Sequence, residues 1–471
     1  MPSDRDTAGT IADQHTSSIS TSSSGQTKTA TLVDSIPAVP SGPRFAEPQG
    51  KIGTFHALRY RDFRLMWIGS FFSSAGQWIQ QATLGWIVYN MTGSGSILGA
   101  INGMRSVPML FLSPVAGVAA DMMNRKALMV NTQIFLTFIS FVLAIDIAIG
   151  TLEIWHLFLF TFLAGAAWSF NMPVRQSVVF NLVPRSVFPN AFALNSVAFN
   201  VTRILGPSSA GFLILWLGPE GNFFIQGIAY LLVSVSMLMV VIPAVSNRGE
   251  KSKGSVAKSM KEGFRYVLKD PIVRTLMLMG LFPVFFVFPY MGLLPIFAKD
   301  VFNGGPQSFG ILLSVSGVGG VLGGLFAAKL GSGFERRGLL QIITMFLFGL
   351  GVLAFALTQS LWAGSIMLIF TGFCQMVFMT TNQTLLQTNI PDELRGRVTS
   401  IYMLDQGLMP LGTVIAGIGS DVFGVQSMVF VMGLTCALLA IVVAISIPRV
   451  RNMRLGATTA PVHYGGSRGG R

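Results

Sequence analysis

Charged residues are scarce in this chain of 471 residues, because Asp, Glu, Lys and Arg together make up only 11% of it. A soluble domain carries about 25%. Hydrophobic residues account for 51%. This composition excludes an ordinary soluble domain and indicates an integral membrane protein. We expect it to be all-helical, because open sheet edges cannot face lipid and the apolar stretches are too long and uniform for barrel strands.

The residues that carry covalent or metal chemistry are also few. The chain has two cysteines, both within apolar stretches, where a small packing residue is expected rather than a disulfide. Its four histidines are scattered without the spacing of a metal site. A Gly-rich phosphate-binding loop with its lysine is absent from the sequence, which argues against direct coupling to ATP. We therefore expect no enzyme activity, no metal and no cofactor.

The chain does contain twelve long apolar stretches, each near or above the roughly 20 residues that an α-helix needs to cross about 30 Å of hydrocarbon. They run over about 65–90, 95–120, 127–149, 155–178, 190–216, 221–243, 273–298, 306–330, 339–359, 362–388, 397–420 and 425–447. Lys and Arg fall on every second connection, and the alternate connections carry only Lys299. Because positive loops stay inside, this pattern predicts a multi-pass protein of the cell (inner or plasma) membrane with both termini cytoplasmic.

The basic residues of the same cytoplasmic loops explain the net charge of +13. Because these loops lie near anionic headgroups, we expect the lipid bilayer as a partner and do not expect nucleic acid. The longest connection separates six spans from six, and 255–270 within it has the spacing of an amphipathic helix. We expect a Ser/Thr-rich cytoplasmic extension over 1–55, six-helix bundles over 56–243 and 273–448, a cytoplasmic linker over 244–272 and a basic cytoplasmic tail over 449–471. Two related bundles of this kind can rock against each other around a site at mid-membrane.

The loop after the second span combines Gly117 and Asp121 with the basic pair Arg125 and Lys126. It resembles the signature loop of the major facilitator superfamily, although Met122 replaces the basic residue that usually follows the aspartate. The resemblance implies a major facilitator fold with twelve transmembrane helices in two six-helix bundles, and a monomer. It also implies that this loop latches the two bundles together on the cytoplasmic face. The alternative is an ordinary positively charged loop.

The fifth span contains Gly206, Pro207 and Gly211. It is similar to the Gly-Pro motif in the fifth helix of exporters of this superfamily, with Ala210 and Thr202 where glycines are usual. The alternative is a kinked helix that implies no transport direction. The stretches 58–94, 183–196 and 390–412 are similar to the subgroup that contains bacterial enterobactin and macrolide exporters.

Charged side chains inside the spans are candidates for function, because each costs about 2.5–3.5 kcal/mol to insert. Asp405 lies about 12 Å in from the cytoplasmic start of its span and is the candidate for proton exchange, with Arg105 as its partner. Arg203 is a candidate for binding anionic cargo or a carboxylate. The alternative for Asp405 and Arg105 is a static ion pair between helices. The alternative for Arg203 is a purely structural role. Asp146 and His156 are expected at the outer interface.

Spans 1, 4, 7 and 10 line the central cavity in the family that this chain resembles. A polar stripe in span 1, and polar residues of the other three, are therefore candidates for contact with cargo, although some of them are expected to bond only neighbouring helices. They are Ser74, Gln77, Gln81, Asn171, Tyr290, Gln375, Asn382 and Gln383. Prolines and phenylalanines over 282–290 predict a bent helix with an apolar wall, which suits bulky amphipathic cargo.

Together these features predict a secondary active transporter that exports a hydrophobic or amphipathic small molecule, such as a drug, macrolide or siderophore-like compound, by alternating access. A proton gradient would supply the energy in place of a cofactor. Two alternatives remain open from the sequence: uptake or facilitated transport by the same fold, and a membrane sensor or scaffold that does not transport.

Overall fold

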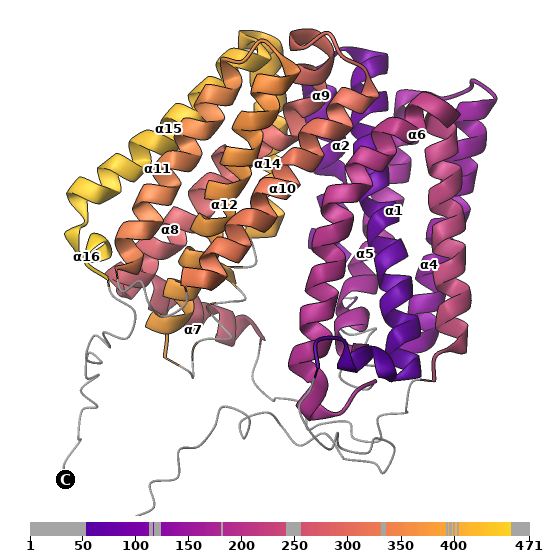
Figure 1. Ribbon diagram of the computed structural model, residues 1–471, viewed down its shortest axis with the longest axis horizontal. Coiled ribbons are helices and arrows are strands. Elements are labelled where there is room, and N and C mark those ends of the chain that lie inside the picture. Colours follow the sequence, from indigo (N-terminus) through magenta and orange to yellow (C-terminus); the bar gives the residue numbers. More distant parts are fainter. Residues whose placement is uncertain are drawn as a thin grey trace, which may run out of the picture. The chain divides into compact units, whose positions relative to one another are not determined.

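The computed structural model describes residues 53–112, 116, 124–179, 182–241, 256–330, 336–391, 394, 398, 401–402 and 405–453. Within these residues every regular element is a helix (Figure 1). The first half contains α1 (Arg61–Thr92), α2 (Gly95–Met104), α4 (Arg125–Ala148), α5 (Ile154–Val179) and α6 (Phe188–Met239). The second half contains α7 (Val256–Lys269), α8 (Pro271–Phe286), α9 (Leu294–Ile296), α10 (Pro306–Leu330), α11 (Arg337–Ala356), α12 (Leu361–Asn389), α14 (Asp405–Phe423), α15 (Val425–Ser446) and α16 (Pro448–Arg451).

The helices follow the apolar stretches of the sequence. In the described part of the chain, eight helical stretches are long and apolar enough to cross a membrane. One of them, Arg185–Met239, covers two expected spans that meet at Gly218, where a φ of 69° breaks the helix just before Pro219. The expected span 1 lies within α1, and α2 and α14 cover parts of the expected spans 2 and 11. The all-helical membrane fold is thus confirmed, while the count of twelve crossings stays a prediction.

Several helices begin where a short polar side chain can accept the first free backbone N–H groups. Asp270 accepts from Ile272 N and Val273 N at 2.8 and 3.1 Å, and Pro271 fills the first helical position of α8. Asn124 in the same way caps α4, and Ser360 caps α12. Each such cap stabilises a helix start by about 1 kcal/mol. These local signals fix where the apolar stretches become helices.

The seventh expected span is interrupted by its prolines. α8 ends at Phe286, and the chain continues as a 3-10 helix over Phe288–Leu293, then α9, then a π-turn over Phe297–Val301. Each proline removes a backbone donor, so a regular helix cannot continue through this segment. The bend predicted from the sequence is therefore present.

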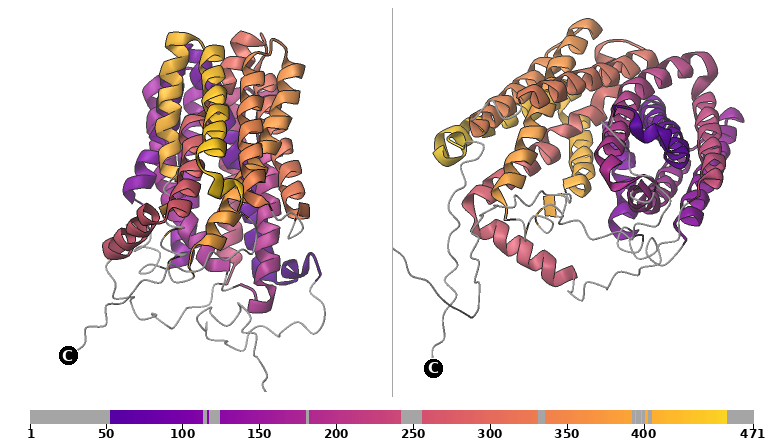
Figure 2. Two further views of the ribbon diagram at one scale, coloured as in Figure 1. Left: turned by 90° about the vertical axis from the view of Figure 1, so that its left-hand side faces the viewer. Right: turned by 60° about the horizontal axis from the view of Figure 1, so that its bottom comes forward.

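The core of each half is formed by contacts between long helices. In the first half α6 packs against both α1 and α4, and in the second half α12 packs against both α10 and α11, which also packs against α15. α7 lies oblique to these long helices, next to α8 (Figure 2). Its Val267 is buried, while Phe264 and Leu268 are exposed. An exposed apolar face on a basic helix is typical of a helix at a membrane surface.

Candidate functional site

The two halves of the molecule meet at Asp421, near the end of α14. Its carboxylate accepts four hydrogen bonds from the start of α2: from Gly95 N at 2.6 Å, Ser96 N at 2.9 Å, Ser96 Oγ at 2.6 Å and Ser94 Oγ at 2.8 Å. A carboxylate at a helix N-terminus is stabilised both by the free N–H groups and by the helix dipole. We call this contact between Asp421 and 94–96 the outer clamp, because the pattern of positive charge predicts that this end of the helices lies outside.

A second set of polar contacts lies at the same end. The hydroxyl of Tyr89, at the end of α1, donates to the Asp300 carboxylate. Lys299 Nζ donates to Asn90 Oδ1 at 3.1 Å and lies 5.7 Å from the centre of the Tyr89 ring, within the range of a cation–π contact. These contacts join α1 to the broken seventh span. The lysine that stood out in the sequence as the exception to the charge pattern thus connects the two halves.

The glycines of the fifth-span motif bring α6 close to two other helices. A Cβ atom added to Gly206 would lie 2.6 Å from Cβ of Trp78 in α1. One added to Gly211 would lie 2.7 Å from the Pro306 carbonyl oxygen, and one on Gly310 would lie 2.6 Å from the Pro207 carbonyl oxygen. Only glycine permits these approaches between α6 and α10, which belong to different halves.

Hydrogen bonds continue the α6–α10 contact toward the middle of the helices. Ser208 Oγ donates to Ser314 Oγ at 2.6 Å, and Ser314 Oγ donates to the Ile204 carbonyl at 2.7 Å. The α2–α14 pair is equally close, since a Cβ on Gly99 would lie 2.6 Å from the Thr413 carbonyl oxygen. Two pairs of helices, α2 with α14 and α6 with α10, therefore hold the halves together in the described state.

Arg105 follows α2 directly and lines a small polar cavity. The cavity has a volume of about 20 Å³, and its other polar walls are Gln80, Gln81, Asn102 and Thr161. This is room for one water molecule rather than for a cargo molecule. The amide chain behind it is buried: Gln226 Nε2 donates to Gln80 Oε1 at 2.5 Å and to the Tyr230 hydroxyl at 3.0 Å.

Arg203 lies on α6 beside the contact with α10. A Cβ on Gly320 would lie 2.4 Å from Arg203 Nη2, so the guanidinium occupies the space that a side chain on α10 would fill. Its Nε is buried and has no hydrogen-bond partner among the described residues. Among the residues that the structure describes, no carboxylate forms an ion pair with Arg203 or Arg105. Both cations therefore lie inside the helix bundle without a described counter-charge.

The residues proposed to line the cavity fall into two groups. Gln81 and Gln383 are exposed, Gln77 and Gln375 are half-buried, and all four remain candidates for contact with cargo. The other four, Ser74, Asn171, Tyr290 and Asn382, are buried. Asn171 donates to Thr132 Oγ1 at 3.1 Å, and Asn382 Oδ1 accepts from Gln341 Nε2 at 2.5 Å. These two asparagines thus bond neighbouring helices within their own halves.

The structure also identifies polar residues that the sequence analysis did not select. Arg175, in α5, donates from Nη2 to the Ser70 carbonyl at 3.1 Å and lies 3.5 Å from Ser74 Oγ. A basic residue near the end of an apolar stretch fits the pattern of positive cytoplasmic loops, which gave no reason to select it. Its place inside the expected span 155–178 was the signal that could have marked it. Gln226 and Tyr230 gave no signal, because single polar residues in an apolar span have no unique partner.

Part of the predicted latch and proton site lies outside the described residues. This applies to Gly117, to Asp121 and to the side chain of Asp405, the residue at which the described part of α14 begins. Arg125 begins α4, and Lys126 Nζ donates to the Leu238 carbonyl at 2.7 Å, close to the end of α6. That contact lies within the first half, so the role of the loop as a latch between halves stays a prediction. Among the described residues, no group of three or more His, Cys, Asp or Glu side chains could hold a metal ion.

Comparison with known proteins gives a consistent set of relatives. The Staphyloferrin A transporter of Staphylococcus aureus is 27% identical over 375 residues, which are 78% of this chain and 92% of the relative. Macrolide efflux protein A of Streptococcus pyogenes is 24% identical and covers 83% of this chain and 96% of its own. The multidrug efflux pump Tap of Mycolicibacterium fortuitum is 24% identical, with coverages of 82% and 95%.

Solved structures show the same fold. A bacterial homologue of the human lysosomal transporter Spinster, in an inward-facing and unoccupied conformation, superposes with a TM-score of 0.66 at 16% identity over 86% of this chain and 98% of the other. The nucleoside transporter NupG gives a TM-score of 0.63 at 16% identity, over 81% and 98% of the two chains. The family model described as "transmembrane secretion effector" matches residues 52–465. The resemblance stated from the sequence is thus confirmed, and the chain belongs to the transmembrane secretion effectors, an efflux-type family of major facilitator transporters.

Proposed function

We propose that this transporter exports an amphipathic small molecule with an anionic group by alternating access, and that proton influx drives the export. The relatives are named for a siderophore, for macrolides and for several drugs, which supports a bulky cargo. The proposal would place the transporter in the cell membrane with both termini in the cytoplasm, working as a monomer with a proton gradient in place of a cofactor.

The observation that carries alternating access is the closure at one end of the molecule. The outer clamp and the Tyr89–Asp300 contact join the halves near the connections that carry little positive charge, and the α6–α10 pair joins them closer to the middle of the helices. Closure at the outer end corresponds to a state that receives cargo from the cytoplasm. Export then requires these contacts to break, because cargo leaves by the path that they block.

Two arginines support an anionic group on the cargo. Arg105 and Arg203 lie in apolar spans, and among the described side chains, which do not include that of Asp405, neither forms an ion pair with a carboxylate. A charge in a membrane helix costs about 2.5–3.5 kcal/mol on insertion scales. A carboxylate on the cargo would offset part of that cost. The phenylalanines of α8 support the apolar part of the cargo, because Phe282 and Phe286 lie 4.6 Å apart between ring centres and neither is buried.

Proton influx supplies enough energy for such a step, since a potential of 100 mV is worth about 2.3 kcal/mol per charge. The test is transport by inside-out vesicles that contain the full chain. The assay compares a macrolide and a carboxylate siderophore with and without a pH gradient, and we expect at least one of them to accumulate only with the gradient. Entry that stops at equal concentrations and does not depend on the gradient would mean facilitated transport, and no flux of any compound in the panel would contradict export.

Asp405 is the proposed proton site. Replacing it with Asn keeps the size of the side chain but removes its titration, so we expect Asp405→Asn to abolish efflux driven by a pH gradient and to preserve counterflow of cargo. Counterflow needs the conformational change but no net proton movement. Asp62→Asn is the matched control, because within the described residues Asp62 accepts one long hydrogen bond of 3.3 Å from Val241 N. Efflux by the Asp405 variant at the rate of the control would exclude this residue from coupling.

A further inference from the structure

A larger cavity lies away from the central arginines, between α4 and α5. Its volume is about 350 Å³, within the range of pockets that hold small ligands. Seven apolar side chains form most of its wall, and three further residues stand at one end: Phe138, Ile139, Val142, Leu143, Leu159, Phe160 and Leu163, with Asp146, Trp155 and His156. We call this cavity the α4–α5 groove. Neither the fold nor the transport cycle proposed above uses it.

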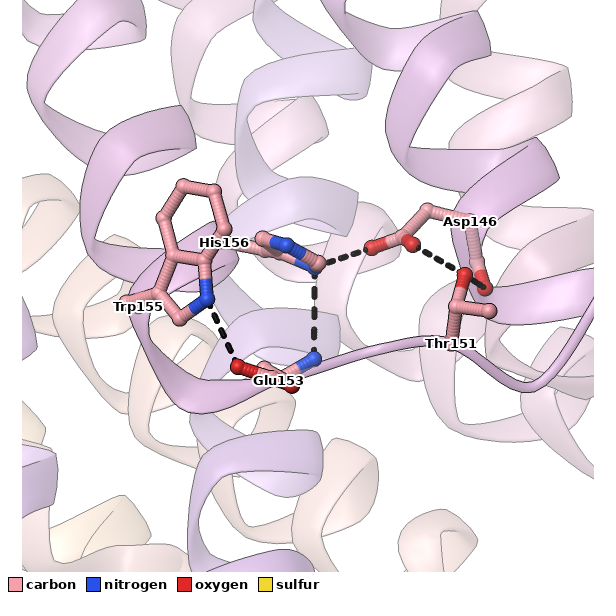
Figure 3. A network of polar contacts seen from close by, with 5 residues as sticks. All are labelled: Asp146, Thr151, Glu153, Trp155 and His156. Atoms are coloured by element: carbon pink, nitrogen blue, oxygen red, sulfur yellow. Dashed lines mark hydrogen bonds and ion pairs between the residues drawn. The ribbon is translucent and has the colours of Figure 1, made fainter.

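The polar end of the groove is a connected cluster near the turn between the two helices (Figure 3). Asp146 Oδ2 lies 2.7 Å from His156 Nδ1, and the Thr151 hydroxyl donates to Asp146 Oδ1 at 2.6 Å. Trp155 Nε1 donates to Glu153 Oε2 at 2.7 Å. The Trp155 ring stands edge-on to the His156 ring, with centres 4.0 Å apart. The Asp146 carboxylate and the Trp155 and His156 rings thus line the mouth of an apolar groove, and the Glu153 carboxylate lies beside the indole ring.

We propose that the α4–α5 groove binds a phosphatidylethanolamine molecule of the outer leaflet. One acyl chain lies along the apolar wall, and the ammonium group lies against the Asp146 carboxylate, beside the Trp155 ring. The inference is independent of the cargo and of proton coupling.

The wall of the groove suits a lipid chain because it is open to the membrane side. Phe138 is 65% exposed, Val142 49% and Leu159 47%, although all three lie within helices that are long and apolar enough to cross a membrane. Their neighbours Leu143 and Phe160 are buried and form the floor. Such exposed apolar surface on a membrane helix faces acyl chains, and here it is concave rather than flat. An acyl chain in this groove therefore contacts protein on several sides.

The charges at the mouth favour an amine over a phosphate or a neutral headgroup. Asp146 and Glu153 are acidic, and the connection between α4 and α5 contains no Lys or Arg. Asp146 uses one lone pair on each oxygen, so an ionised carboxylate retains acceptor sites for an incoming N–H donor. A primary ammonium group offers three such donors. The exposed Trp155 ring adds a cation–π contact.

The test uses the purified full-length protein in detergent, stripped of lipid, with native mass spectrometry to measure bound phospholipid. We expect phosphatidylethanolamine to bind more tightly than phosphatidylglycerol of the same chains. Asp146→Asn should weaken phosphatidylethanolamine binding by about tenfold and leave phosphatidylglycerol binding unchanged, because a charge-assisted hydrogen bond is lost. Val142→Trp should weaken binding of both lipids, because it fills the groove.

Leu231→Trp is the control for a bulky residue on a lipid-facing helix, since Leu231 of α6 is 45% exposed and lies outside the groove. Thermal unfolding of each variant shows whether it is folded. The proposal is wrong if the two lipids bind equally, if Asp146→Asn binds phosphatidylethanolamine like the unaltered protein, or if Leu231→Trp lowers binding as much as Val142→Trp. Displacement of the lipid by a macrolide at micromolar concentration would instead identify the groove as a cargo site and would also overturn it.

Discussion

At the scale of single residues, Arg203 shows how a charge inside a membrane helix leads to a testable prediction of function. Its guanidinium lies against Gly320 without a described carboxylate, and its Nε lacks a partner among the described residues. We expect Arg203→Gln to raise the KM for an anionic cargo about tenfold, and to leave the melting temperature unchanged or higher, because an unpaired charge is costly in the membrane. Transport kinetics and thermal unfolding in the same detergent check both. A lower melting temperature with an unchanged KM would mean that the arginine is structural.

The same scale shows where the sequence stops being informative. Charges such as Arg105 and Arg203 are found from their position within apolar spans, because any charge there is unusual. The direction of a neutral polar side chain is harder to predict. Asn382 is buried against Gln341 while Gln383, the next residue, is exposed. A membrane helix is apolar on several faces, so hydrophobic periodicity does not fix its rotation, and the cargo-facing side cannot be chosen from the sequence alone.

At the scale of helices, the α6–α10 pair depends on glycine. We expect Gly211→Ala to separate these helices, because its Cβ would lie 2.7 Å from the Pro306 carbonyl oxygen. Cysteines at Ser208 and Ser314, whose hydroxyl oxygens are 2.6 Å apart, report on this contact by forming a disulfide, with Cys374 and Cys436 replaced by Ala. Cross-linking should be about tenfold slower with Gly211→Ala than without it, as a shift of about 1.4 kcal/mol in the closed state would cause.

The matched control for this prediction is Gly324→Ala, on the partner helix α10. A Cβ at Gly324 would meet only Cγ of Met376, at an ordinary distance of 3.6 Å. Cross-linking at an unchanged rate in the control and a slower rate in Gly211→Ala supports the role of the motif. Equal rates in both variants would mean that the glycine is dispensable for closure.

Helix boundaries were more predictable than helix partners. The break at Gly218 and Pro219 and the interrupted seventh span follow from proline and glycine, which act on the backbone wherever they stand. The pairing of α2 with α14 joins residues more than 300 positions apart, as between Gly95 and Asp421. Neither helix has a local sequence feature that identifies its partner, so this pairing cannot be predicted from the sequence of the two helices.

At the scale of the whole molecule, the closed end was the feature that the sequence did not predict. The transport cycle proposed above needs two alternative states, and the sequence does not indicate which of them is the more stable. The hydrogen bonds of the outer clamp show that the described state is the one that is closed at this end. The clamp's Asp421 carboxylate belongs to the second half and its N–H donors to the first, so the clamp exists only while the halves touch at this end.

Removing the clamp should therefore change the population of states rather than the fold. We expect Asp421→Ala to favour opening at the outer end, because hydrogen bonds to a charged acceptor contribute about 1.5–3 kcal/mol each and four are lost together. A cysteine at Gln81, which is exposed and lines the cavity beside Arg105, should then react at least about tenfold faster with a membrane-impermeant maleimide added from outside.

Asp421→Asn retains one acceptor oxygen and should give an intermediate rate. Glu220→Gln, in the connection between the two parts of α6, removes a charge without touching the clamp and should leave the rate unchanged. If labelling in Asp421→Ala were as slow as in this control, the outer clamp would not hold the halves together, and the closure would have to rest on the remaining contacts, which are the Tyr89–Asp300 hydrogen bond and the close glycine approaches of α2–α14 and α6–α10.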